Sequence, residues 1–232
     1  SHKRLVPFLA ASACAFGIGF VSTLMSAPAG ERFDHKVRND FFAGFSGNQE
    51  ALERAMKSTE DTLRKEPDHA EALVWHGSGL YYQSGMAFRS GDQAKGMEIF
   101  KRGLAEMDRA VELEPKNVGV RIPRGASLLS GSRFMPPDIA RPLLEKAVND
   151  YETVYELQKN HLNQLGVHPR GELLFGLAEG LGRLGEQEKA TRFFEQILRD
   201  MKGTPYADRA ALWMENKSLP IEKTGCIGCH VE

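Results

Sequence analysis

The sequence predicts an all-α protein. Apolar residues recur at spacings of three and four over residues 49–215, Pro67 and Pro115 each end one such stretch, and no stretch alternates apolar and polar residues as a strand does. With 41% hydrophobic and 26% charged residues in 232, the chain has enough apolar side chains to bury a core. We therefore expect one main helical domain with appended segments.

Residues 1–30 carry the signature of a membrane segment. Lys3 and Arg4 are followed by an uncharged run from Leu5 to Gly30, and about 20 apolar helical residues are enough to cross a bilayer. Because the basic residues come first, the N-terminus is expected in the cytoplasm and the rest outside. This predicts a single-pass anchor in a bacterial inner membrane, with the remainder of the chain in the periplasm.

Two other interpretations of this segment stay open. Ala27-Pro28-Ala29 is a small-residue stretch at which a secretory signal could be cleaved. A lipoprotein site at Cys14 is the weaker alternative, since Ala11 stands where such sites prefer leucine. If the segment is retained, a ridge of small residues could pack against another membrane helix. That ridge consists of Ala11, Ala15, Gly19 and Thr23.

Residues 31–48 form a connector with a helical pattern. Phe33, Val37, Phe41 and Phe45 repeat every four residues and indicate an amphipathic helix. We expect it to cap the helices that follow. Lying on the membrane surface or meeting a partner are the alternatives.

The helices expected after residue 48 each have an apolar stripe. The first stripe is Leu52, Ala55, Met56, Thr59 and Leu63, before Pro67. The second is Ala72, Trp75, Gly79 and Tyr82, and the third is Met97, Phe100, Leu104, Met107 and Val111, before Pro115. After the Gly/Ser/Pro-rich stretch SGSRFMPPD, Asp138 is expected to cap a helix whose stripe is Leu144, Val148, Tyr151 and Tyr155.

The stretches RKEPDHAEALVW, ELEPKNVGVRIP and GVHPRGELLFGLAEGLGRL indicate internal repetition. This region resembles the tetratricopeptide repeat family. One copy matches the family pattern at Leu174, Ala178, Leu181, Gly185, Ala190, Phe194 and Ile197, and an earlier copy at Trp75, Gly79, Tyr82, Ala110 and Pro115. Pro67 and Pro115 are 48 residues apart, whereas the family period is about 34. The resemblance implies an irregular α-solenoid over residues 49–215.

The final segment, residues 216–232, contains Cys226-Ile-Gly-Cys229-His230. This spacing resembles the haem-attachment site of c-type cytochromes. The resemblance implies one covalently bound haem c, with thioethers to Cys226 and Cys229 and with His230 as the proximal iron ligand. A zinc site would need a fourth ligand, and a redox-active pair normally belongs to a βαβ unit that this sequence does not indicate. The sixth iron ligand stays open: Met214, Met201, His168, a partner residue or none.

These observations predict an electron-transfer protein rather than an enzyme. The net charge of −1 gives no basic field for nucleic acid, and no phosphate loop or nucleophile motif is found. His69, His76 and His161 are scattered, and the carboxylates are expected on solvated helix faces. We expect a membrane-anchored periplasmic monohaem c-type cytochrome whose repeats dock it to a membrane redox complex. A repeat scaffold or assembly factor with structural or no haem is one alternative, and a haem sensor or peroxidase is another.

Overall fold

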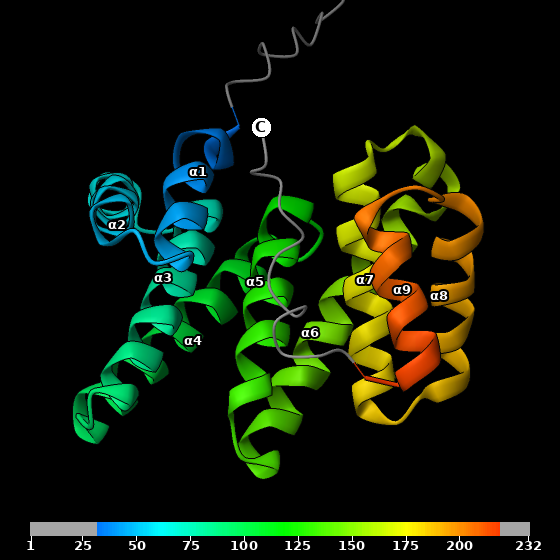
Figure 1. The fold of residues 1–232 in the computed structure, drawn as a ribbon. Coiled ribbons are helices and arrows are strands. Elements are labelled where there is room, and N and C mark those ends of the chain that lie inside the picture. The colour runs from blue at the N-terminus through cyan, green and yellow to red at the C-terminus, as the bar shows by residue number, and fades with distance from the viewer. Residues whose placement is uncertain (1–31, 219–232) are drawn as a thin grey trace, which may run out of the picture. The chain divides into compact units, whose positions relative to one another are not determined.

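The computed structural model describes residues 32–218, and every regular element in that range is helical (Figure 1). The prediction of an all-α protein is thereby confirmed. The described helices belong to one compact unit that begins at Phe33. Their bounds are α1 Phe33–Phe45, α2 Gln49–Leu63, α3 Ala70–Arg89, α4 Gln93–Leu113, α5 Val118–Gly131, α6 Pro137–Gln158, α7 Val167–Leu184, α8 Gln187–Asp200 and α9 Pro205–Asn216, with short 3-10 helices at Ser132–Phe134 and Lys159–Gln164.

Polar residues before several helices determine where those helices begin. The side chains of Asn48, Asp92 and Asn117 accept hydrogen bonds from backbone N–H groups of the first turns of α2, α4 and α5, at 3.1, 3.0 and 2.7 Å. His69 does the same for α3, with Nδ1 accepting from the N–H of Ala72 at 3.2 Å. These bonds satisfy donors that have no partner within a helix.

The prediction that Asp138 caps a helix is wrong. α6 begins one residue earlier, at Pro137, and its N-cap is Pro136, which makes no side-chain cap bond. Proline is suited to this first position because its φ is already helical and its missing N–H would have had no helical partner. Asp138 instead lies in the first turn, where its negative charge interacts favourably with the helix dipole.

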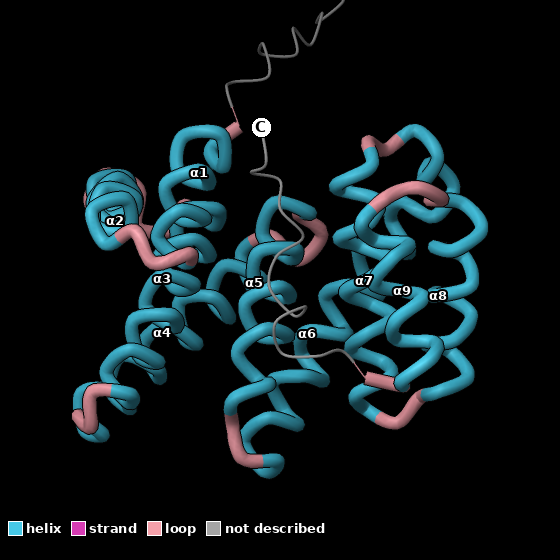
Figure 2. Tube along the Cα trace, in the orientation of Figure 1, coloured by secondary structure: helices cyan, strands magenta, loops and turns pink. Residues whose placement is uncertain are grey.

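Successive helices pack as neighbouring pairs. α1 contacts α2, α3 contacts α4, α5 contacts α6, α7 contacts α8, and α9 packs on α8. Across the pairs, α3 contacts α5, α5 contacts α7, and α7 contacts α9. Short loops join most of the helices, as Figure 2 shows. Within residues 32–218, no helix is both long enough and apolar enough to cross a membrane.

α3 and α4 approach each other through glycines. A Cβ placed on Gly77 would lie 2.7 Å from the carbonyl oxygen of Gly103, and a Cβ on Gly103 would lie 2.8 Å from the carbonyl oxygen of Gly77. Real Cβ atoms do not tolerate such contacts, so the two backbones can meet only because neither residue has a side chain. Met107 and Ala110, both fully buried, complete this interface.

Elsewhere in the described helices, glycines leave room for aromatic rings. At five of them, a Cβ would come within 2.3–2.5 Å of a ring atom from another helix. The pairs are Gly96 with Phe88, Gly131 with Tyr81, Gly171 with Tyr206, Gly176 with Tyr151, and Gly182 with Trp213. Each large ring is therefore matched to a missing side chain on the adjacent element, which lets ring and backbone pack closely.

The apolar face of the connector helix is used inside this unit. Val37 and Phe41 of α1 are fully buried, and the Phe41 ring stacks on Trp75 of α3 with centroids 5.3 Å apart. Because α1 contacts both α2 and α3, these side chains are not left to meet a membrane or a partner.

Most of the expected stripe residues are buried, but Met97 is 40% exposed. Met97 and Met107 are ten residues apart, which at 3.6 residues per turn places them about 80° apart around the helix. α4 turns the side of Gly103 and Met107 toward α3, so Met97 lies outside that contact. The prediction that it shares the buried face is wrong.

Candidate functional site

The expected haem-binding residues Cys226, Cys229 and His230 lie outside the described residues 32–218, as does the expected membrane segment over 1–30. The helix that precedes the last segment is described. α9 ends at Asn216, and Lys217 has a left-handed φ of 55° and donates its N–H to the carbonyl of Trp213 at 2.7 Å.

α9 is firmly packed at this end. The Trp213 ring stacks on Phe194 of α8 with centroids 4.2 Å apart and is 2% exposed. The ammonium group of Lys217 lies 5.2 Å from the Trp213 ring centroid, in a cation–π arrangement. The segment that carries the cysteines therefore leaves from a helix end whose position is fixed by aromatic packing.

The three candidates for a sixth iron ligand have different surroundings. Met201 is 4% exposed and follows α8, whereas Met214 of α9 is partly buried against the core. His168 is exposed near the start of α7, and its Nδ1 lies 2.8 Å from the hydroxyl of Tyr206. The sulfur of Met201 would have to leave the core before it could reach an iron atom.

His76 is a core histidine enclosed by acids. It is 1% exposed, with Nδ1 2.5 Å from a carboxylate oxygen of Glu106 on α4 and Nε2 3.6 Å from one of Glu60 on α2. The side chain thus links three helices through polar contacts. This agrees with the expectation that the scattered histidines serve the structure.

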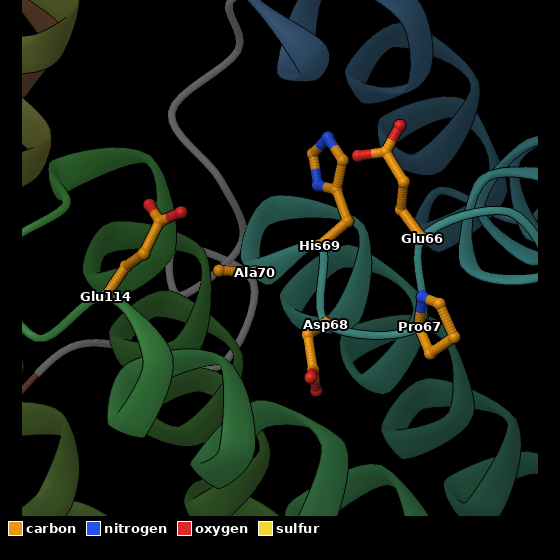
Figure 3. A pocket seen from close by; sticks show the side chains of 6 residues that line it. All are labelled: Glu66, Pro67, Asp68, His69, Ala70 and Glu114. Atoms are coloured by element: carbon orange, nitrogen blue, oxygen red, sulfur yellow. The ribbon is translucent and has the colours of Figure 1, made fainter.

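An open hollow of about 550 Å³ lies where the α2–α3 loop meets the end of α4. In Figure 3, the His69 ring and the Glu66 carboxylate extend to the same side, while the Asp68 carboxylate points away from them. Asp68 accepts a hydrogen bond from Arg109 at 3.3 Å, and Nδ1 of His69 is occupied by the α3 cap. Asp68 and Nδ1 of His69 therefore already have hydrogen-bond partners within the protein. The other lining residues are Pro67, Ala70 and Glu114.

Across the described part of the chain, no three His, Cys, Asp or Glu side chains are grouped so as to hold a metal ion.

A buried ionic network joins α5 and α6. Asp150 of α6 is fully buried and accepts hydrogen bonds from Arg124 at 2.7 and 2.8 Å and from Arg121 at 2.7 Å. Arg124 also donates to Asp108 of α4 at 2.9 Å, and Lys146 donates to the same carboxylate at 2.5 Å. Burial lowers the pKa of Arg124, but the hydrogen bonds and negative charges of Asp150 and Asp108 together outweigh that effect and leave the pKa raised.

A second group of charges lies among the α5–α6 connection, α7 and α9. Arg133 donates from Nε and Nη2 to the same oxygen, Oε1, of Glu179, whose side chain is 6% exposed. Arg183 donates to the carbonyl of Leu129 at 2.7 Å and to the hydroxyl of Ser132 at 2.8 Å. The guanidinium carbon of Arg209 lies 5.1 Å from the centroid of the Phe175 ring. We call Arg133, Arg183, Arg209 and Glu179 the arginine cluster.

The prediction that the carboxylates lie on solvated helix faces is wrong for Asp150 and Glu179. The sequence did contain a sign that these two acids are buried. Asp150 shares a helical face with Ala147 and Val154, and Glu179 interrupts the otherwise uncharged run LLFGLAEGL. An acid within an apolar stripe is buried if a cation reaches it from another helix, and the sequence does not reveal which cation does so.

Comparisons with known proteins found no matching family model, no matching curated protein and no matching solved structure. The function of the chain therefore has to be argued from its own residues.

Proposed function

We propose that this protein is a membrane-anchored, periplasmic, monohaem c-type cytochrome subunit that carries electrons within or to a larger membrane redox complex. The observation that carries the proposal is the sequence Cys226-Ile-Gly-Cys229-His230. Two thiols at this spacing can form thioethers with one haem, and the adjacent imidazole can bind its iron. Haem bound there would supply one-electron oxidation and reduction.

The chain's own residues have distinct tasks in this proposal. Cys226 and Cys229 hold the cofactor covalently, and His230 binds the iron as the proximal ligand. Trp213 packs the end of α9 against Phe194, and the haem-binding segment follows this helix in the sequence.

We further infer that the helices form an irregular tetratricopeptide-like solenoid that serves as the docking scaffold. The pairs α3/α4, α5/α6 and α7/α8 support this inference, as do the burial of the pattern residues Ala178, Ala190 and Phe194 and the glycine contact between α3 and α4. Stacked helix pairs offer extended surfaces that suit protein partners. The expected partners are other subunits of a membrane redox complex.

The test is covalent haem content. The full chain, produced together with a c-type cytochrome maturation system, should gain the mass of one haem that survives denaturation and should give a c-type pyridine haemochrome spectrum. Cys226→Ala and Cys229→Ala should each lose correct attachment. Cys14→Ala is the matched control, because it removes the remaining cysteine outside the motif and should leave haem content unchanged.

An unmodified wild-type chain under these conditions would reject the cytochrome and favour the haem-free scaffold. If haem is attached, the reduced protein should be tested for carbon monoxide binding and for peroxide turnover. Fast ligand binding with turnover would favour the sensor or peroxidase alternative over electron transfer.

A further inference from the structure

A second open hollow, of about 580 Å³, lies among α1, α2 and the α2–α3 loop, and we call it the basic hollow. Its lining includes four Lys or Arg side chains, which are Lys36 of α1, Arg54 and Lys57 of α2, and Lys65 just after α2. Two carboxylates, those of Asp61 and Glu66, also line it.

Two of these charged residues already have partners of opposite charge. Nη2 of Arg54 lies 2.7 Å from a carboxylate oxygen of Asp40 on α1. Asp61 is paired with Arg64, one helical turn further along the chain. Because each pair brings together one positive and one negative charge, neither pair decides the net charge of the hollow.

The three lysines of the basic hollow are not paired in this way. Within residues 32–218, the side chains of Lys36, Lys57 and Lys65 are exposed and form no ion pair or hydrogen bond with another residue. Glu66 is the one lining carboxylate that the two ion pairs leave, so the hollow keeps an excess of positive charge. Lysine ammonium groups around an open hollow suit a phosphate group.

The basic hollow is close in sequence to the proposed membrane anchor. Lys36 is six residues after Gly30, and even a fully extended chain covers only about 20 Å in six residues. If residues 1–30 cross the membrane as proposed, Lys36 therefore stays near the bilayer surface. Val37 and Phe41 are fully buried inside the domain, so α1 would meet that surface with its exposed polar residues.

We propose that the basic hollow binds the phosphate headgroup of an anionic membrane lipid, with Lys36, Lys57 and Lys65 supplying the positive charge. This inference rests on the membrane anchoring in the proposed function and is independent of haem. Anionic lipids attract basic segments next to a membrane helix. Binding would hold α1 and α2 against the bilayer surface.

The experiment measures the rate of lysine acetylation in the full chain reconstituted into lipid nanodiscs. Discs of phosphatidylcholine are compared with discs in which about a quarter of the lipid is phosphatidylglycerol. Mass spectrometry should show Lys57 and Lys65 reacting several-fold more slowly in the anionic discs. Salt at about 1 M, which screens charges beyond about 3 Å, should restore their rates. Lys202, exposed between α8 and α9, should react equally in both discs.

A double variant connects this protection to the basic hollow. Lys36→Gln combined with Lys57→Gln should remove most of the protection of Lys65, because two of the three unpaired charges are lost. The same two positions changed to Arg keep the charge and should keep the protection. Lys95→Gln with Lys101→Gln, which removes two exposed lysines of α4, is the matched control. If Lys65 stays equally protected in the double Gln variant, the hollow does not bind the headgroup.

The remaining outcomes separate the lipid from other causes. Inorganic phosphate added to the phosphatidylcholine discs should leave Lys57 and Lys65 reactive, and protection equal to that in the anionic discs would overturn the lipid assignment in favour of a free anion. A chain that does not elute with the discs would reject the membrane anchor and this site together. A chain that elutes with both discs but reacts equally in them would reject this site alone.

Discussion

Arg124 and Asp150 form a bidentate ion pair across α5 and α6, with Nε 2.7 Å from Oδ2 and Nη2 2.8 Å from Oδ1. Arg121 bonds to the same carboxylate from one turn earlier on α5, so a single buried acid holds two arginines. Because both helices contribute charges to this network, α5 and α6 can pair in only one register without leaving a charge unmatched.

Asp150→Asn should therefore be strongly destabilising. The variant keeps the shape of the side chain but leaves Arg121 and Arg124 without their shared negative charge, and losing one partner of a buried pair costs about 3–5 kcal/mol. Urea unfolding should show this loss. Asp40→Asn is the control, since its ion pair with Arg54 lies at the surface and should contribute little. If Asp150→Asn and Asp40→Asn lose similar amounts of stability, burial is not what makes the ion pairs of Asp150 important.

Gly77→Ala should destabilise the protein by about 1–3 kcal/mol, because its Cβ would overlap the backbone of α4. Gly85→Ala in the same helix should instead stabilise by about 0.5–1 kcal/mol, since its Cβ would meet only the flexible end of Arg89 and alanine favours the helix. Thermal unfolding of the two variants should give shifts of opposite sign. A stabilising Gly77→Ala would show that the α3–α4 contact is looser than described.

The buried hydroxyl of Tyr81 should make stability fall in alkali. Burial raises its pKa above the ordinary value of 10.0. Above pH 10 the unfolded chain therefore loses this proton first, and the free energy of unfolding falls by up to about 1.4 kcal/mol per pH unit.

Tyr81→Phe keeps the ring that packs on Phe100 and removes the titrating group. Unfolding free energies measured by urea between about pH 8 and 11 should fall less steeply for the variant. The contribution of Tyr81 is fully present below pH 10 and is lost above it. Parallel curves for the two proteins would contradict the prediction.

Cell fractionation should place the protein in the inner membrane, because Lys3 and Arg4 precede the uncharged run from Leu5 to Gly30. Protease added to spheroplasts should digest the helical domain, whereas a cytoplasmic marker should survive. Recovery in the soluble periplasm with a new N-terminus near Gly30 would instead establish the cleaved-signal interpretation.

Gentle detergent extraction should recover the protein together with other membrane redox subunits. Gly19→Leu should weaken this association, because a large side chain would interrupt the small-residue ridge of the expected membrane helix. Ile18→Leu, a volume-conserving change next to the ridge, is the control. Recovery of the wild type only as a monomer, unaffected by either change, would leave the docking role unsupported.

Local periodicity in the sequence was enough to predict the helical class and most of the buried stripes. Leu174, Ala178 and Phe194 are buried as their spacing requires, because a helix that repeats apolar residues at three and four has one face to hide. The motif Cys226 to His230 was likewise found from spacing alone, and it stays a prediction.

Contacts between distant segments decided the rest. Only the packed structure shows that Arg133 reaches Glu179 across 46 residues of sequence, that Gly131 makes room for Tyr81, and that α4 turns Met97 away from α3. The spacing within one helix specifies which face is apolar, but it carries no information about which cation or ring a neighbouring helix will present to that face. Burial of a charge depends on that neighbour, and so the acids in the core and the arginine cluster could be located only from the tertiary structure.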